Sequence, residues 1–239
     1  QVVVINHGQL STFCDQEWNL NPYNVANGGF LKSPEEFFTN ARARTLTRNK
    51  LRYIIGRWGC ESHLFSLVLI NEINLIGSSG RFHREPTVGE WYAEMGAWLE
   101  KNDPWDHLVS AHYTVLIDNN VLRSPWVDFT ITNAYYDARS SSLFAFLPEI
   151  WNFNRRFGKP TFISEYGGTS GGATEDNLKR DVLAGLWMSA HLPFAGGPLF
   201  WWHRFVDEMN LYPYYLSLRS FLKDVDRLQT ELNPENVVL

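Results

Sequence analysis

The stretch Leu64-Phe65-Ser66-Leu67-Val68-Leu69-Ile70, followed at once by Asn71-Glu72, decides the predicted fold. A continuous apolar run of this length is typical of a strand that is buried on both faces, because a half-exposed strand would alternate apolar and polar residues. A carboxylate directly after such a strand is costly to bury. The sequence therefore predicts a buried strand whose C-terminal end opens onto a pocket.

The same pattern recurs along the chain. Apolar runs predict six strands, at residues 2–5, 64–70, 107–113, 127–135, 161–164 and 197–202. Helices are predicted from about Pro34 with Ser33 as N-cap, from a Thr87 to Glu90 capping box through Leu99, and at 143–157, 176–190 and 216–228. Strands that alternate with helices predict an α/β fold with a parallel sheet and helices packed outside it.

Composition narrows the class of protein. A chain of 239 residues that is 44% apolar and 20% charged predicts one globular domain over residues 1–239. A net charge of −5 without a basic block argues against a nucleic acid partner. No apolar run approaches the roughly 20 residues of a membrane helix, so no membrane partner is expected. No signal peptide precedes Gln1, which leaves the compartment open.

The cysteines add little at this level. Cys14 and Cys60 are too few for a disulfide framework, and their spacing matches no metal site. No cofactor is predicted.

The ends of the predicted strands carry the residues that could do chemistry. In βα-barrels the catalytic groups lie at the C-terminal ends of the strands. Those ends carry His7, Asn71, Glu72, His112, Tyr113, Asn133, Tyr135, Glu165, Trp201, Trp202 and His203. Cleavage of a glycosidic bond with retention needs one carboxylic acid and one carboxylate, about 5–5.5 Å apart. Glu72 and Glu165 are the predicted pair.

The other residues at the strand ends fit substrate binding. Tyr135 could orient the nucleophile, and Asn71 could hold a sugar hydroxyl. Trp202 offers a flat face for a sugar ring, whereas its neighbour Trp201 would pack against helices. His7, His112 and Asn133 complete the predicted substrate-binding set.

Each residue also has an ordinary interpretation. A single glutamate after a strand is more often a solvated loop residue or a helix cap. His7 and His112 could be ordinary hydrogen-bonded histidines. The two glutamates on separate strand ends are more informative together than either is alone.

These segments resemble clan A of the glycoside hydrolases, especially the cellulase- and mannanase-like enzymes. Asn71-Glu72 resembles the acid/base motif that ends strand four, and Ser164-Glu165-Tyr166-Gly167 resembles the nucleophile segment of strand seven. Tyr135 falls where the family has a tyrosine on strand six, and Trp201-Trp202 resembles the strand-eight tryptophan. The resemblance implies a (β/α)8-barrel that hydrolyses β-linked glucan or mannan with retention.

The chain departs from this family in two ways. Asn133 stands where many relatives have a histidine. If Glu72 ends strand four, then Val2–Ile5 is strand three, and the first two β/α units are missing. A barrel with open edges would need a partner, so we expect a homo-oligomer or a domain swap. In the family an arginine on strand two supports the nucleophile, and its loss could weaken activity.

Two alternatives remain at this level. The chain could be an inactive barrel fragment or a carbohydrate-binding protein without catalysis. A metal-dependent hydrolase that uses His7, His112 and His203 is the weaker alternative, because these histidines lack tight ligand spacing.

Overall fold

The computed structural model describes residues 1–136, 142–169 and 172–225. Within these residues one sheet holds five strands, β1 (Val2–Ile5), β2 (Ser66–Ile70), β3 (Leu108–Tyr113), β4 (Phe129–Ala134) and β5 (Thr161–Tyr166). Their order in the sheet is their order along the chain. The strands run parallel, and helices separate most of them along the chain, which confirms the α/β class.

The helices lie between and after the strands. The α-helices are α1 (Ala41–Trp58), α2 (Pro86–Asn102), α3 (Asn120–Arg123), α4 (Leu143–Asn154), α5 (Glu175–His191), α6 (His203–Glu208) and α7 (Tyr212–Leu222). Short 3₁₀ turns are η1 (His7–Leu10), η2 (Glu17–Leu20), η3 (Val25–Asn27), η4 (Pro34–Phe38), η5 (Ile73–Leu75), η6 (Phe82–Arg84) and η7 (Arg155–Phe157).

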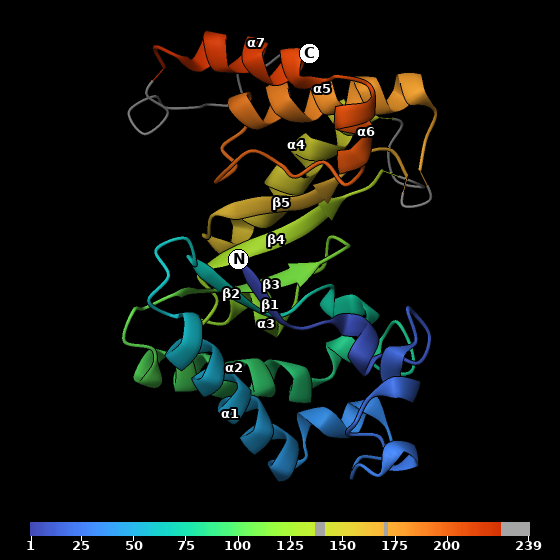
Figure 1. Ribbon diagram of the computed structural model, residues 1–239, viewed down its shortest axis with the longest axis vertical. Helices are drawn as coiled ribbons and strands as arrows, with labels where there is room; N and C mark the ends of the chain where they lie inside the picture. Colours follow the sequence, from blue (N-terminus) through green and yellow to red (C-terminus); the bar gives the residue numbers. More distant parts are fainter. Residues whose placement is uncertain (137–141, 170–171, 226–239) are drawn as a thin grey trace. The chain divides into compact units, whose positions relative to one another are not determined.

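The chain divides into two compact units, Gln1–Thr130 and Ile131–Leu239. In the first unit, α1 and α2 pack against one face of the sheet formed by β1, β2 and β3 (Figure 1). Every residue of β2 is buried, as expected for a central strand. Ile5 pairs with Ile70, so β1 and β2 end at the same level. This register brings the polar residues that follow the two strands together.

The second unit is built around β5. Helices α4 and α5 pack together, and α7 lies beside α5 (Figure 1). Residues 199–201 run alongside β5, because Tyr166 N–H donates to Leu199 O (3.1 Å) and Trp201 N–H donates to Tyr166 O (2.9 Å).

The prediction of a sixth regular strand at 197–202 is wrong. Its only bridge within the described residues pairs Tyr166 with Phe200. Pro198 has no N–H to give to a ladder, and the chain enters α6 at His203, so the segment is too short for regular pairing.

Three predicted helix boundaries are also wrong. Ser33 makes no capping hydrogen bond, and Pro34 opens a 3₁₀ turn. Helix α1 begins later, where the Asn40 side chain accepts from the N–H groups of Arg42 and Ala43. Helix α2 starts at Pro86, which places Thr87 inside the helix and rules out the predicted capping box. The last predicted helix, 216–228, is replaced by α7, which ends at Leu222, and 226–228 lie outside the described residues.

The outer edge of β1 is covered in part by a lysine. Among the described strands, β1 pairs only with β2, and Lys50 Nζ donates to Val4 O at 2.6 Å. Because this lysine of α1 occupies a carbonyl group of the edge strand, it opposes the addition of another strand there. The expected oligomer or domain swap stays a prediction, as does the single-domain organisation. Among the described residues, no helix has the length and apolar character needed to cross a membrane.

Candidate active site

The first half of the candidate site lies where β1 and β2 end. Asn71 N–H donates to Ile5 O (3.3 Å), and His7 N–H donates to Asn71 Oδ1 (2.8 Å). Asn71 therefore fixes the backbone of His7 with its oxygen, and its Nδ2 group is the donor that it can offer a ligand. Glu72 follows Asn71 directly, so these three predicted residues lie together.

His7 lies between two carboxylates. Its Nε2 is 2.7 Å from Asp15 Oδ2, and its Nδ1 is 3.1 Å from Glu72 Oε2. The second contact has the distance but not the angle of a hydrogen bond, so a small rotation would complete it. Because the His7 ring is buried, its protons are confined to these two partners. If Nδ1 carries a proton, it donates to the Glu72 carboxylate. If Nδ1 carries none, it accepts from a protonated Glu72.

The backbone of Glu72 is left-handed, with φ of 44° and ψ of 53°. This region costs a residue with a long side chain roughly 1–2 kcal/mol. Such strain persists only where the surroundings enforce it, and it concentrates at functional sites. The strained backbone marks Glu72 as a functional candidate independently of any sequence motif.

The strain at Glu72 predicts a stability difference between two neutral variants. Asn tolerates the left-handed region better than Gln does. We expect Glu72→Asn to have a free energy of unfolding about 1 kcal/mol higher than Glu72→Gln. Urea denaturation of both proteins measures this difference. A Glu72→Gln protein as stable as Glu72→Asn would mean that the backbone of residue 72 is not held in the left-handed region.

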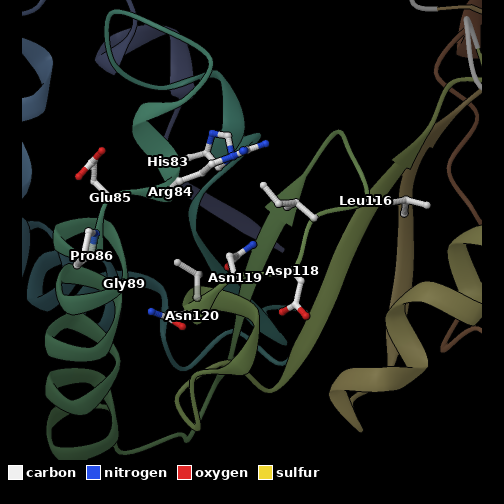
Figure 2. Close-up of a pocket in the computed structure, with 11 residues that line it drawn as sticks. His83, Arg84, Glu85, Pro86, Gly89, Leu116, Asp118, Asn119 and Asn120 are labelled. Atoms are coloured by element: carbon white, nitrogen blue, oxygen red, sulfur yellow. The ribbon is translucent and has the colours of Figure 1, made fainter.

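A polar pocket of about 470 Å³ opens beyond the loops that follow β2 and β3. The two loops are tied together because Asn74 Nδ2 donates to Thr114 Oγ1 (2.7 Å) and Thr114 N–H donates to Asn74 Oδ1 (2.9 Å). Figure 2 shows His83 and Arg84 on one side of this pocket and Asp118 and Asn119 on the other.

The pocket offers both donors and acceptors. Burial lowers the pKa of His83, and the charge of Arg84 lowers it further, but both ring nitrogens are buried. The donors and acceptors at the pocket wall therefore come from Arg84, Asp118 and Asn119. None of these lining residues was predicted from the sequence, because His83 and Arg84 precede α2 in a segment without a recognisable motif. His112, which was predicted, is buried within β3.

The second half of the candidate site surrounds Glu165, near the end of β5. Tyr135 Oη donates to Glu165 Oε2 at 3.0 Å, and Asn133 Nδ2 donates to the same oxygen at 3.1 Å. Ser164 Oγ in turn donates to Asn133 Oδ1 at 2.9 Å, which orients the amide. Two donors to one carboxylate oxygen favour the ionised form of the group and fix its direction. The second unit thus brings three of the predicted residues together.

A glycine turn follows Glu165 and supports Trp202. The indole Nε1–H of Trp202 donates to Gly167 O at 2.8 Å. Gly167 has a φ of 129°, and a Cβ there would lie 2.5 Å from the ring of Phe200, so only glycine fits. Trp202 lines a pocket of about 500 Å³ with Trp201 and His203. Trp201 is 49% exposed, so it does not pack under helices as predicted.

A buried aspartate holds the same turn from α5. Asp181 accepts from Gly168 N–H (2.7 Å) and from Tyr136 Oη (2.9 Å). Burial raises the pKa of the Asp181 carboxyl group, although both hydrogen bonds oppose this shift. Burial and the contact with Asp181 raise the pKa of Tyr136 to about 12. The sequence showed no reason to single out either residue.

Comparison with known proteins identifies the fold. In sequence, no family model and no curated protein matches the chain. Among similar solved structures, an endo-β-1,4-mannanase from Thermotoga petrophila has a TM-score of 0.55 at 16% identity, over 83% of this chain and 48% of that chain. An endo-1,4-β-mannanase from Rhizomucor miehei has a TM-score of 0.56 at 15% identity, over 83% and 61%. A β-glucuronidase from Bifidobacterium dentium has a TM-score of 0.54 at 18% identity, over 69% and 28%.

These similarities show that the chain has a fold of the TIM-barrel type, similar to that of these glycoside hydrolases. The chain spans between 48% and 61% of the length of these two mannanases. At this level of identity the likeness concerns the fold alone.

Proposed function

We propose that the chain is a retaining glycoside hydrolase that acts on β-linked glucan or mannan. The observation that carries this proposal is the carboxylate of Glu165, which receives hydrogen bonds from Tyr135 and Asn133 at the end of a barrel strand. A carboxylate that is ionised and aimed in this way is what a glycosidase nucleophile requires.

The reaction would proceed in two steps. In the first step a Glu165 oxygen attacks the anomeric carbon, the glycosidic bond breaks, and the carboxyl group of Glu72 gives its proton to the departing oxygen. In the second step Glu72 takes a proton from water, which attacks the anomeric carbon and releases Glu165. Two displacements at one carbon retain its configuration. No cofactor takes part.

The other predicted residues have binding roles in this proposal. Asn71 donates from Nδ2 to a sugar hydroxyl next to the reacting carbon. Trp202 presents an indole face to a sugar ring, with its edge anchored on Gly167. His7 and His112 remain candidates for substrate contacts, with His7 also controlling the proton on Glu72.

The pocket beside α2 would receive the sugar on the leaving-group side. It belongs to the same unit as Glu72, which protonates the leaving group, and its volume of about 470 Å³ falls within the range of ligand pockets. Its mixed donors and acceptors suit a polyhydroxylated ring better than an apolar or strongly anionic ligand.

The stereochemistry of the products tests the proposed function. Hydrolysis of manno- and cello-oligosaccharides followed by proton NMR should give the β-anomer first, before mutarotation. Initial formation of the α-anomer would refute the double displacement.

A carbohydrate-binding protein without turnover is the second candidate. It is favoured by Trp201, which is 49% exposed and lines the same pocket as Trp202, so that two indole rings are available to a sugar. Calorimetric binding of an oligosaccharide that stays intact after long incubation would support it.

A further inference from the structure

A cluster of three different metal-ligand types lies next to Glu72. The imidazole of His7, the thiol of Cys14 and the carboxylate of Asp15 each have a ligand atom within 4.8 Å of the other two. The loop between them is ordered by hydrogen bonds, since the N–H groups of Phe13 and Cys14 both donate to Ser11 Oγ. Asp15 has a φ of 53°, a left-handed turn that directs the loop back toward His7.

The spacing suits one cation. Bonds of about 2.3 Å to sulfur and about 2.1 Å to nitrogen or oxygen, at the tetrahedral angle, place the ligand atoms of a single zinc ion roughly 3.4–3.6 Å apart. Small side-chain rotations of Cys14 and Asp15, which are not fully buried, would bring all three atoms into that range. Mixed sulfur, nitrogen and oxygen ligands select borderline-soft divalent cations over Mg²⁺ or Ca²⁺.

The contact that Nδ1 of His7 makes with Glu72 is an independent indication of a metal site. Histidines that bind metal usually donate from their other ring nitrogen to a carboxylate, which fixes the ring and the tautomer. His7 is 4% exposed, and its Nδ1, which lacks a hydrogen bond of good geometry, is 3.1 Å from Glu72 Oε2. Nε2 faces Asp15 on the other side.

We propose that His7 Nε2, Cys14 Sγ and Asp15 bind a thiophilic divalent cation such as Zn²⁺ or Cd²⁺, with Glu72 as the carboxylate behind the histidine. Binding displaces the proton on Nε2 and the proton of the thiol, and leaves Asp15 as it is. Burial, followed by the charges of Asp15 and Glu72, raises the pKa of the Cys14 thiol, so the ion must displace a bound proton.

The proton balance has a consequence for Glu72, which rests on the proposed function. With a cation on Nε2 and the Nε2 proton released to solvent, the acid proton of Glu72 passes to Nδ1, which then donates to the Glu72 carboxylate. Glu72 is then held as a carboxylate and cannot protonate a leaving group. The cation would therefore act as a reversible inhibitor.

Titration with Cd²⁺ tests the site without any substrate. Binding should produce a thiolate-to-metal charge-transfer band in the ultraviolet with one equivalent of Cd²⁺. The band should vanish in Cys14→Ser and persist in Cys60→Ser, the matched control because Cys60 is the other, exposed thiol. Glu72→Gln should weaken Cd²⁺ binding by about 10–100-fold, the usual effect of removing a carboxylate behind a metal-bound histidine.

Other results would overturn the proposal. A band that survives Cys14→Ser, or one that disappears in Cys60→Ser, would place the ion elsewhere. Circular dichroism checks whether Cys14→Ser folds. If Cys14→Ser is misfolded, Asp15→Asn serves as the test instead, because it keeps the thiol and should also weaken Cd²⁺ binding. Because the band is measured without turnover, it reports on the cation site even if the chain proves inactive as a hydrolase.

Discussion

Incubation with an activated 2-deoxy-2-fluoro-β-glycoside should add the mass of one fluorosugar to the peptide that carries Glu165. Fluorine at C2 destabilises the oxocarbenium-like transition states of both steps, and a good leaving group restores only the first. The covalent glycosyl-enzyme therefore accumulates. Mass spectrometry of a proteolytic digest locates the label.

The matching variant should lose nearly all activity. Glu165→Gln keeps the shape of the side chain and its place beside Tyr135 and Asn133, but an amide cannot act as the nucleophile. We expect kcat/KM to fall by several powers of ten, since each tenfold loss corresponds to about 1.4 kcal/mol of transition-state stabilisation. Glu149→Gln, an exposed carboxyl group on α4 of the same unit, is the control and should keep full activity. A label on any carboxylate other than Glu165 would remove the nucleophile assignment.

The regular part of the fold could be predicted because its signals are local. The strand at 64–70 and the helix at 176–190 were predicted close to their observed bounds, since a buried parallel strand and an amphipathic helix each have a strong periodicity. The segment at 197–202 was predicted wrongly because apolar aromatic composition indicates burial but does not guarantee ladder hydrogen bonds. Helix starts failed where a nearby residue, such as Asn40 in place of Ser33, made the better cap.

The candidate site could be predicted only in part. The glutamates and Tyr135 stand directly after apolar runs, so their position at strand ends followed from the pattern. The roles of Asp15 and Asp181 could not be predicted, because each reaches its partner through a turn or from a helix distant in sequence. The backbone strain at Glu72 was also hidden, since glutamate has no special preference for a left-handed conformation.

The second large effect concerns Glu72, and its size should depend on the leaving group. Glu72→Gln cannot protonate a departing sugar, so hydrolysis of an oligosaccharide should fall by several powers of ten. An aryl glycoside with a good leaving group needs no proton in the first step, so its bond cleavage should be far less affected. Comparison of the two substrates on the same variant measures the proton donation itself.

Two further measurements separate this role from a structural one. Azide needs no general base to attack the glycosyl-enzyme, so it should accelerate turnover of the aryl glycoside by Glu72→Gln and yield a β-glycosyl azide. Glu90→Gln, an exposed carboxyl group on α2, should behave like the native protein on both substrates. Equal losses on the two substrates without azide rescue would mean that Glu72 supports the fold around His7.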